Sequence, residues 1–349
     1  MIVSKEECAE LSYYRTELMG AAIIMVMFCH NTIQFSENDL TLIWKSFSSY
    51  FQVGVDIFFF LSGLGCVFSL QKTSGYSEFM KRRIWRIIPA YLAVDGGWCL
   101  FQKIVWNTSL IVSLKEYSLI SFFTHGILSE WYIAAILVLY AICPFLYDIL
   151  KRDRKRYCIY LIAILVISIS LSFFHLSDTF QTINEIFFVR IPTFGLGIIL
   201  GDYLKLQKLD NFAEDKAKEG KISCTLWVLF ACLLAFLMVN SAYNHTNEWC
   251  VMRALFLPLG VLLSIILCHV FRYSDLLKRP FRFLGGITLE LYLIHGKILG
   301  VVDSFVQNMM GNGIVILILI QIISILLAVS ISFVVNFLIT IVQRFNNGM

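Results

Sequence analysis

Long apolar runs alternate with short polar segments along the whole chain. A transmembrane helix needs about 20 consecutive, predominantly apolar residues. Stretches that meet this requirement lie near residues 16–35, 51–70, 87–106, 130–149, 157–175, 183–204, 222–240, 250–271, 283–303 and 314–341. The pattern therefore predicts an all-α polytopic membrane protein with about ten transmembrane helices.

Lysine and arginine residues are concentrated in alternate connections between these stretches. The basic clusters at 81–86 and 151–156 fall on one side, whereas the loops of the other side hold only Lys45 and Lys115. Cytoplasmic loops carry such an excess of basic residues. We therefore expect both termini in the cytoplasm, and we expect residues 1–349 to form a single transmembrane domain.

The composition agrees with a membrane protein. Hydrophobic residues make up 58% of the chain, charged residues 15%, and the mean hydropathy is +0.77. Soluble domains are closer to half apolar and a quarter charged. The short basic clusters between apolar spans do not form the basic face of a nucleic-acid-binding domain. The ten cysteines show no C-x-x-C spacing, so we expect neither a metal site nor a disulfide framework.

Two ionisable residues of the first two spans are predicted to lie at a similar depth. His30 lies about 21 Å from the cytoplasmic start of the first span, and Asp56 lies about 8 Å below the outer face in the second. A carboxylate bonded to one imidazole nitrogen fixes the tautomer and makes the other nitrogen more basic. We therefore expect Asp56 to orient His30 as a catalytic pair.

Three further ionisable residues lie within apolar spans. Arg190 and His295 are predicted in the same outer layer, whereas Glu290 is predicted nearer the cytoplasmic side. Intramembrane ionisable residues mark functional sites by default, so these three are candidate substrate-binding residues. The alternative is that they form structural hydrogen-bonded pairs with one another.

A basic cluster precedes the third span, in the segment FMKRRIWRIIPAYL at 79–92. Helical spacing places Arg82, Arg83 and Arg86 on one side. Guanidinium groups bind phosphate bidentately, so the cluster is a candidate phosphate site at the inner mouth of a cavity. The alternative is an ordinary cytoplasmic anchor.

Six segments of the chain, in the right order, resemble blocks of the acyltransferase 3 family of integral-membrane O-acyltransferases. They are ELMGAAIIMVMFCH, which ends at His30, GVDIFFFLSG, FMKRRIWRIIPAYL, WYIAAILVLYAICP, RIPTFGLGIILG and LGGITLELYLIH. The resemblance covers nearly the whole chain. One departure is Met19, where the family often has a basic residue. Arg15 lies about 60° around the helix from His30 and is a candidate substitute.

The resemblance implies transfer of an acyl group, usually acetyl, from cytoplasmic acyl-CoA to a hydroxyl outside the membrane. The acceptor would be a cell-surface glycan or a lipid-linked saccharide, and the setting a bacterial inner or plasma membrane. His30 would act as a general base or become acylated itself. The three arginines would hold the CoA phosphates. The competing hypothesis is a secondary transporter of a small polar or anionic solute, because transporters also use buried ionisable residues.

Overall fold

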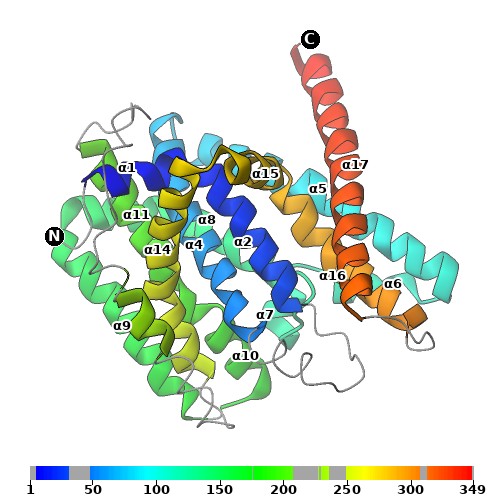
Figure 1. Cartoon of the computed structure of the whole chain (residues 1–349), viewed down its shortest axis with the longest axis horizontal. Coiled ribbons are helices and arrows are strands. Elements are labelled where there is room, and N and C mark those ends of the chain that lie inside the picture. Colours follow the sequence, from blue (N-terminus) through cyan, green and yellow to red (C-terminus); the bar gives the residue numbers. More distant parts are fainter. Residues whose placement is uncertain are drawn as a thin grey trace.

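The computed structural model describes residues 5–30, 48–174, 176–206, 227, 229–235, 249–306 and 313–347. These residues form helices joined by short turns, without a strand among them (Figure 1). The elements are α1 (Lys5–Tyr13), α2 (Arg15–His30), η1 (Ser49–Gln52), α4 (Val53–Gln71), α5 (Tyr76–Trp106), α6 (Leu110–Glu116), α7 (Ser121–His125), α8 (Trp131–Arg152), α9 (Arg154–Ser172), α10 (Asp178–Ile186), η2 (Phe188–Arg190), α11 (Ile191–Leu206), α14 (Trp249–Tyr273), α15 (Asp275–Gly286), α16 (Thr288–Val306) and α17 (Gly313–Asn347). The all-α prediction is confirmed.

Helix α4 is the centre of the bundle. Every residue from Val53 to Val67 is buried, because the helix is apolar on all sides and packs against α2, α8, α11 and α14. Glycines allow the closest of these approaches. A side chain at Gly63 would overlap the Phe194 carbonyl of α11, and one at Gly197 would overlap the Phe60 carbonyl of α4. The two helices therefore meet backbone to backbone.

The predicted number of spans is not confirmed. Six helices of the described chain are long and apolar enough to cross a membrane, or seven if α15 and the first part of α16, bent by 79°, count as one broken span. They are Ser49–Gln71, Trp131–Arg152, Arg154–Ser172, Asp178–Leu206, Cys250–Tyr273 and Ile318–Ile341. Helices α2 and α5, which overlap two predicted spans, are not among the six. The stretch predicted at 222–240 lies mostly outside the described residues.

Helices α5, α16 and α17 lie on one side of α2 and α4, whereas α9, α10 and α11 lie on the other (Figure 1). The C-terminal end of α17 extends beyond the rest of the bundle. Helix α5 is continuous through Pro89, so the arginine cluster and the predicted third span belong to one helix. The candidate site lies where α2 and α4 face α5, α16 and α17.

Candidate active site

A cavity of about 360 Å³ lies among α2, α4, α5, α8, α16 and α17. Arg15, Arg83 and Arg86 line it near Tyr140 of α8, over whose ring the Arg83 guanidinium lies at 4.9 Å. Tyr132 lines it as well, eight residues earlier on the same helix and therefore about 12 Å away along the axis. The cavity thus runs from a cluster of cations to an aromatic end.

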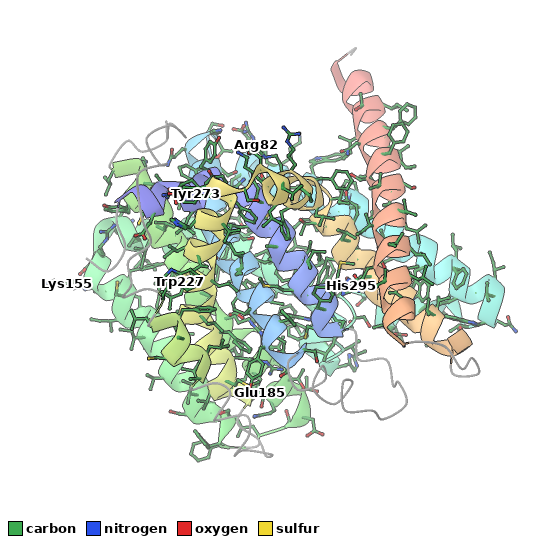
Figure 2. The ribbon with its side chains drawn as sticks, viewed as in Figure 1. Arg82, Lys155, Glu185, Trp227, Tyr273 and His295 are labelled. Carbon is green, nitrogen blue, oxygen red and sulfur yellow. The ribbon has the colours of Figure 1, made fainter. Side chains whose placement is uncertain are left out.

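An adjoining pocket of about 240 Å³ extends the basic surface. It shares Arg15, Arg83 and Arg86 with the larger cavity and adds Lys72 and Arg82. In Figure 2, Arg82 lies near the top of the bundle and Glu185 near the bottom, with His295 at a height between them. The structure therefore brings together the three arginines expected from the sequence and places Arg15 with them.

The arginines of the cluster are held differently. The Arg83 guanidinium donates to the Gly65 carbonyl at 2.7 Å. Arg82 is exposed and forms an ion pair of 2.5 Å with Glu78, one helical turn away. Hydrogen bonds from the Ser74 amide and hydroxyl, and then from Arg82, lower the pKa of Glu78 to about 2. Glu78 therefore remains ionised at physiological pH and offsets the charge of Arg82.

His30, the last residue of α2, is hydrogen-bonded to His295 of α16. The distance from His295 Nε2 to His30 Nδ1 is 3.0 Å, and His295 Nδ1 lies 2.9 Å from the Leu291 carbonyl oxygen. A carbonyl only accepts, so Nδ1 of His295 carries a proton and its neutral ring presents a bare Nε2. Nδ1 of His30 then donates to that nitrogen.

Asp56 does not orient His30, which corrects the sequence-based prediction. Among the described residues, its carboxylate accepts from Arg190 Nε at 3.2 Å and from the Thr193 hydroxyl at 3.4 Å. Arg190 also donates to the Ile186 carbonyl at 2.8 Å and lies over the Trp131 ring at 5.6 Å. Asp56 and Arg190 are 0% and 2% exposed. Asp56 is therefore the counter-ion of Arg190.

The three predicted substrate-binding residues lie in three different places. Arg190 belongs to the ion pair with Asp56, and His295 supports His30. Glu290 lines the wall of the cavity, close to Ser332 and Asn336 of α17. Arg190 and His295 were predicted to lie in one layer with His30. In the structure, His295 contacts His30, whereas Arg190 contacts Asp56.

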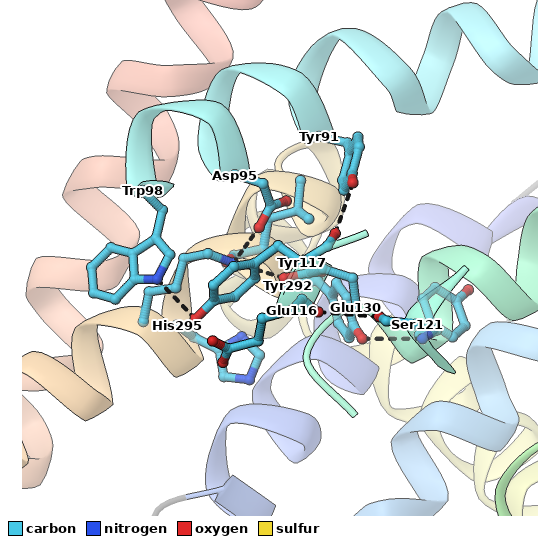
Figure 3. Close-up of polar contacts among 12 residues, drawn as sticks. Tyr91, Asp95, Trp98, Glu116, Tyr117, Ser121, Glu130, Tyr292 and His295 are labelled. Atoms are coloured by element: carbon cyan, nitrogen blue, oxygen red, sulfur yellow. Dashed lines mark hydrogen bonds and ion pairs between the residues drawn. The ribbon is translucent and has the colours of Figure 1, made fainter. Parts of the chain in front are cut away.

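A buried cluster of three residues, Lys297, Glu130 and Asp95, lies near His295 (Figure 3). The Lys297 ammonium group forms ion pairs with Glu130 at 2.7 Å and with Asp95 at 2.8 Å, and it donates to the Leu293 carbonyl at 2.9 Å. The cluster joins α5, the start of α8 and α16. Because Lys297 lies two residues after His295, these ion pairs fix the position of the helix that carries the histidine.

A family model described as an acyltransferase domain matches residues 20–339, nearly the whole chain. The protein belongs to the acyltransferase 3 family. The match confirms the resemblance and supports membrane acyltransferase activity. No curated protein and no solved structure matches the chain.

The Lys297 cluster of this acyltransferase 3 protein was missed by sequence reasoning. Asp95 and Lys297 are each an isolated charged residue in an apolar stretch, and their charges are opposite. Two such residues in different predicted spans were the available signal for an ion pair. The contact of His30 with His295 had no signal in the spacing, because the two residues are 265 positions apart. Tyr132 and Tyr292 carried no charge to mark them.

Proposed function

We propose that this protein transfers an acyl group, typically acetyl, from cytoplasmic acyl-CoA to a hydroxyl of a cell-surface glycan or glycolipid precursor. The observation that carries the proposal is a cavity that leads from three guanidinium groups to Tyr132 and Tyr292. His295, the hydrogen-bond partner of His30, lies next to Tyr292. The family match gives the reaction class. It offers no support for the transporter hypothesis.

The basic end of the cavity suits the phosphates of the donor. Arg83 and Arg86 on α5 and Arg15 on α2 line both pockets, and Lys72 and Arg82 extend the surface outward. Guanidinium groups match phosphate geometry, and their bonds to it are charge-assisted. Arg15 is fifteen residues from His30 on the same helix, about 22 Å along the axis. An extended arm such as that of CoA suits this length.

His30 suits the role of general base beyond the aromatic end of the cavity, to which His295 and Tyr292 connect it. Nε2 of His30 takes the proton of the acceptor hydroxyl, and the hydroxyl oxygen attacks the thioester carbon. The C–S bond then breaks and the proton passes from His30 to the sulfur, so the products are an ester and CoA thiol. His295 accepts from Nδ1 of His30 throughout and stabilises the imidazolium that forms.

Glu290, Ser332 and Asn336 form a polar part of the cavity wall. Carboxylate, hydroxyl and amide groups at this position suit the amides of the donor arm. We therefore assign Glu290 to donor binding. The acceptor approaches His30 from the outer side. Both termini then lie in the cytoplasm, and a bacterial inner or plasma membrane is the proposed location.

The proposal is tested by following label from radioactive acetyl-CoA in membranes that contain the full-length protein. We expect label in the glycan or glycolipid fraction with the wild type and none with His30→Ala. Equal labelling by the two proteins contradicts the proposal. Equal amounts of both proteins in the membrane, measured by immunoblot, make the comparison valid.

A further inference from the structure

Tyr292 lies between the donor cavity and the histidine pair. It lines the aromatic end of the cavity, and its ring centroid is 6.0 Å from that of His295, three residues later on α16. The phenol oxygen accepts the backbone N–H of Tyr132 at 3.3 Å. Within the described part of the chain, the O–H of Tyr292 has no acceptor of its own. A hydrogen-bond donor is therefore held at this position without a protein partner.

The partner of the phenol oxygen is the amino-terminal end of α8. Tyr132 is the second residue of this 22-residue helix, so its N–H has no carbonyl partner within the helix. The aligned peptide dipoles give this end a partial positive charge. A hydroxyl that accepts such a bond is polarised and donates its own proton more strongly. The position of Tyr292 thus favours donation toward a developing negative charge.

The Lys297 cluster fixes the same two helices relative to one another (Figure 3). Glu130 immediately precedes α8, and its ion pair with Lys297 ties that end to α16. The rings of Tyr132 and Tyr292 lie 5.2 Å apart. The phenol therefore keeps one position relative to His295, and through His295 to His30. Preorganised donors of this kind need no rearrangement during a reaction.

We propose that Tyr292 is a further catalytic residue, whose O–H donates to the carbonyl oxygen of the acyl group during transfer. This inference rests on the proposed acyltransferase function. When the acceptor oxygen bonds to the thioester carbon, the carbonyl π electrons move to the oxygen, and Tyr292 stabilises that oxyanion. When the C–S bond breaks, the electrons return to form the ester carbonyl and the sulfur takes the proton from His30. Tyr292 keeps its own proton throughout.

The test is Tyr292→Phe in the full-length protein purified in detergent, with acetyl-CoA as the probe and release of CoA thiol as the readout. The loss of one oxyanion donor lowers kcat by roughly 10²–10³ in well-studied enzymes. We expect a decrease of that size with little change in KM, because the bond strengthens in the transition state. Tyr91→Phe is the matched control. It removes a phenol that donates to the Tyr117 carbonyl at 2.8 Å outside the cavity, and it should keep wild-type turnover.

Wild-type kcat in Tyr292→Phe overturns the proposal while leaving the proposed function intact. A change in KM alone also overturns it, because the phenol then only binds the donor. Release of CoA by the wild type no faster than by His30→Ala instead contradicts the proposed function.

A second measurement keeps Tyr292 unchanged, in case the variant does not fold. The sample is His30→Ala protein with bound acetyl-CoA that carries carbon-13 at the carbonyl. Isotope-edited infrared spectra should show the carbonyl stretch at a lower frequency than that of the same acetyl-CoA after excess CoA has displaced it from the protein. A bound carbonyl stretch with no such downward shift overturns the proposal.

Discussion

His295 Nε2 lies 3.0 Å from His30 Nδ1, while the other nitrogen of His295 faces the Leu291 carbonyl. This relationship selects one tautomer for each ring and makes Nε2 the basic nitrogen of His30. It assigns to His295 the orienting role that the sequence had assigned to Asp56.

The first prediction concerns His295. His295→Phe should lower kcat by about a hundredfold, because a misplaced catalytic group commonly costs that much. His295→Gln should recover part of the loss, since its amide oxygen can accept from Nδ1 of His30. Steady-state release of CoA thiol measures both. Equal turnover in the two variants would show that only the volume of the side chain matters.

The second prediction concerns the buried pair of Asp56 and Arg190. Asp56→Asn should destabilise the protein by about 3–5 kcal/mol, because it leaves a buried guanidinium without its counter-ion. Asp56→Leu combined with Arg190→Met should recover most of that stability. Thermal unfolding in detergent measures the effect. Asp148→Asn is the control, since its ion pair with Lys151 is exposed and worth about 0–1 kcal/mol. A fully stable Asp56→Asn protein with reduced turnover would restore Asp56 to a catalytic role.

The third prediction concerns the cavity arginines. Arg83→Ala or Arg86→Ala should raise KM for acetyl-CoA by about tenfold to a hundredfold, because a charge-assisted phosphate contact is lost. Lysine should restore only part of the affinity, since it keeps the charge but not the planar fork. Arg152→Ala is the matched control, from an exposed basic site outside both pockets. Arg154 is unsuitable because it forms an ion pair with Asp202. If the cavity variants and Arg152→Ala had the same KM at fixed ionic strength, the cluster would act only as a membrane anchor.

The fourth prediction separates Arg82 from Arg83. Arg82→Ala should raise KM less than Arg83→Ala, because Glu78 already offsets the charge of Arg82. With a pKa of about 2, Glu78 stays ionised well above that pH, so the difference should be constant from about pH 5 to pH 9. Glu78→Gln should lower KM by removing that competing carboxylate. An unchanged or raised KM in Glu78→Gln would contradict this account of the mouth of the cavity.

Sequence reasoning reached the helical class and the family, because both depend on local pattern. It could not pair Asp56 correctly. Depth along a helix follows from residue counting, but the direction of a side chain depends on which helices become neighbours. Arg190 reaches Asp56 across 134 positions of sequence through the close packing of α4 and α11. The spacing of Arg82 and Arg83 likewise could not show that one pairs with Glu78 and the other bonds to Gly65.

The most direct test of the central claim is acetyl-CoA turnover by full-length protein in sealed vesicles of known orientation. With acetyl-CoA supplied only to the face that carries Arg82, Arg83 and Arg86, the wild type should release CoA thiol and His30→Ala should not. Supplying acetyl-CoA only to the opposite face should give no release from either protein. Wild-type turnover by His30→Ala, or turnover from the opposite face alone, would contradict the account.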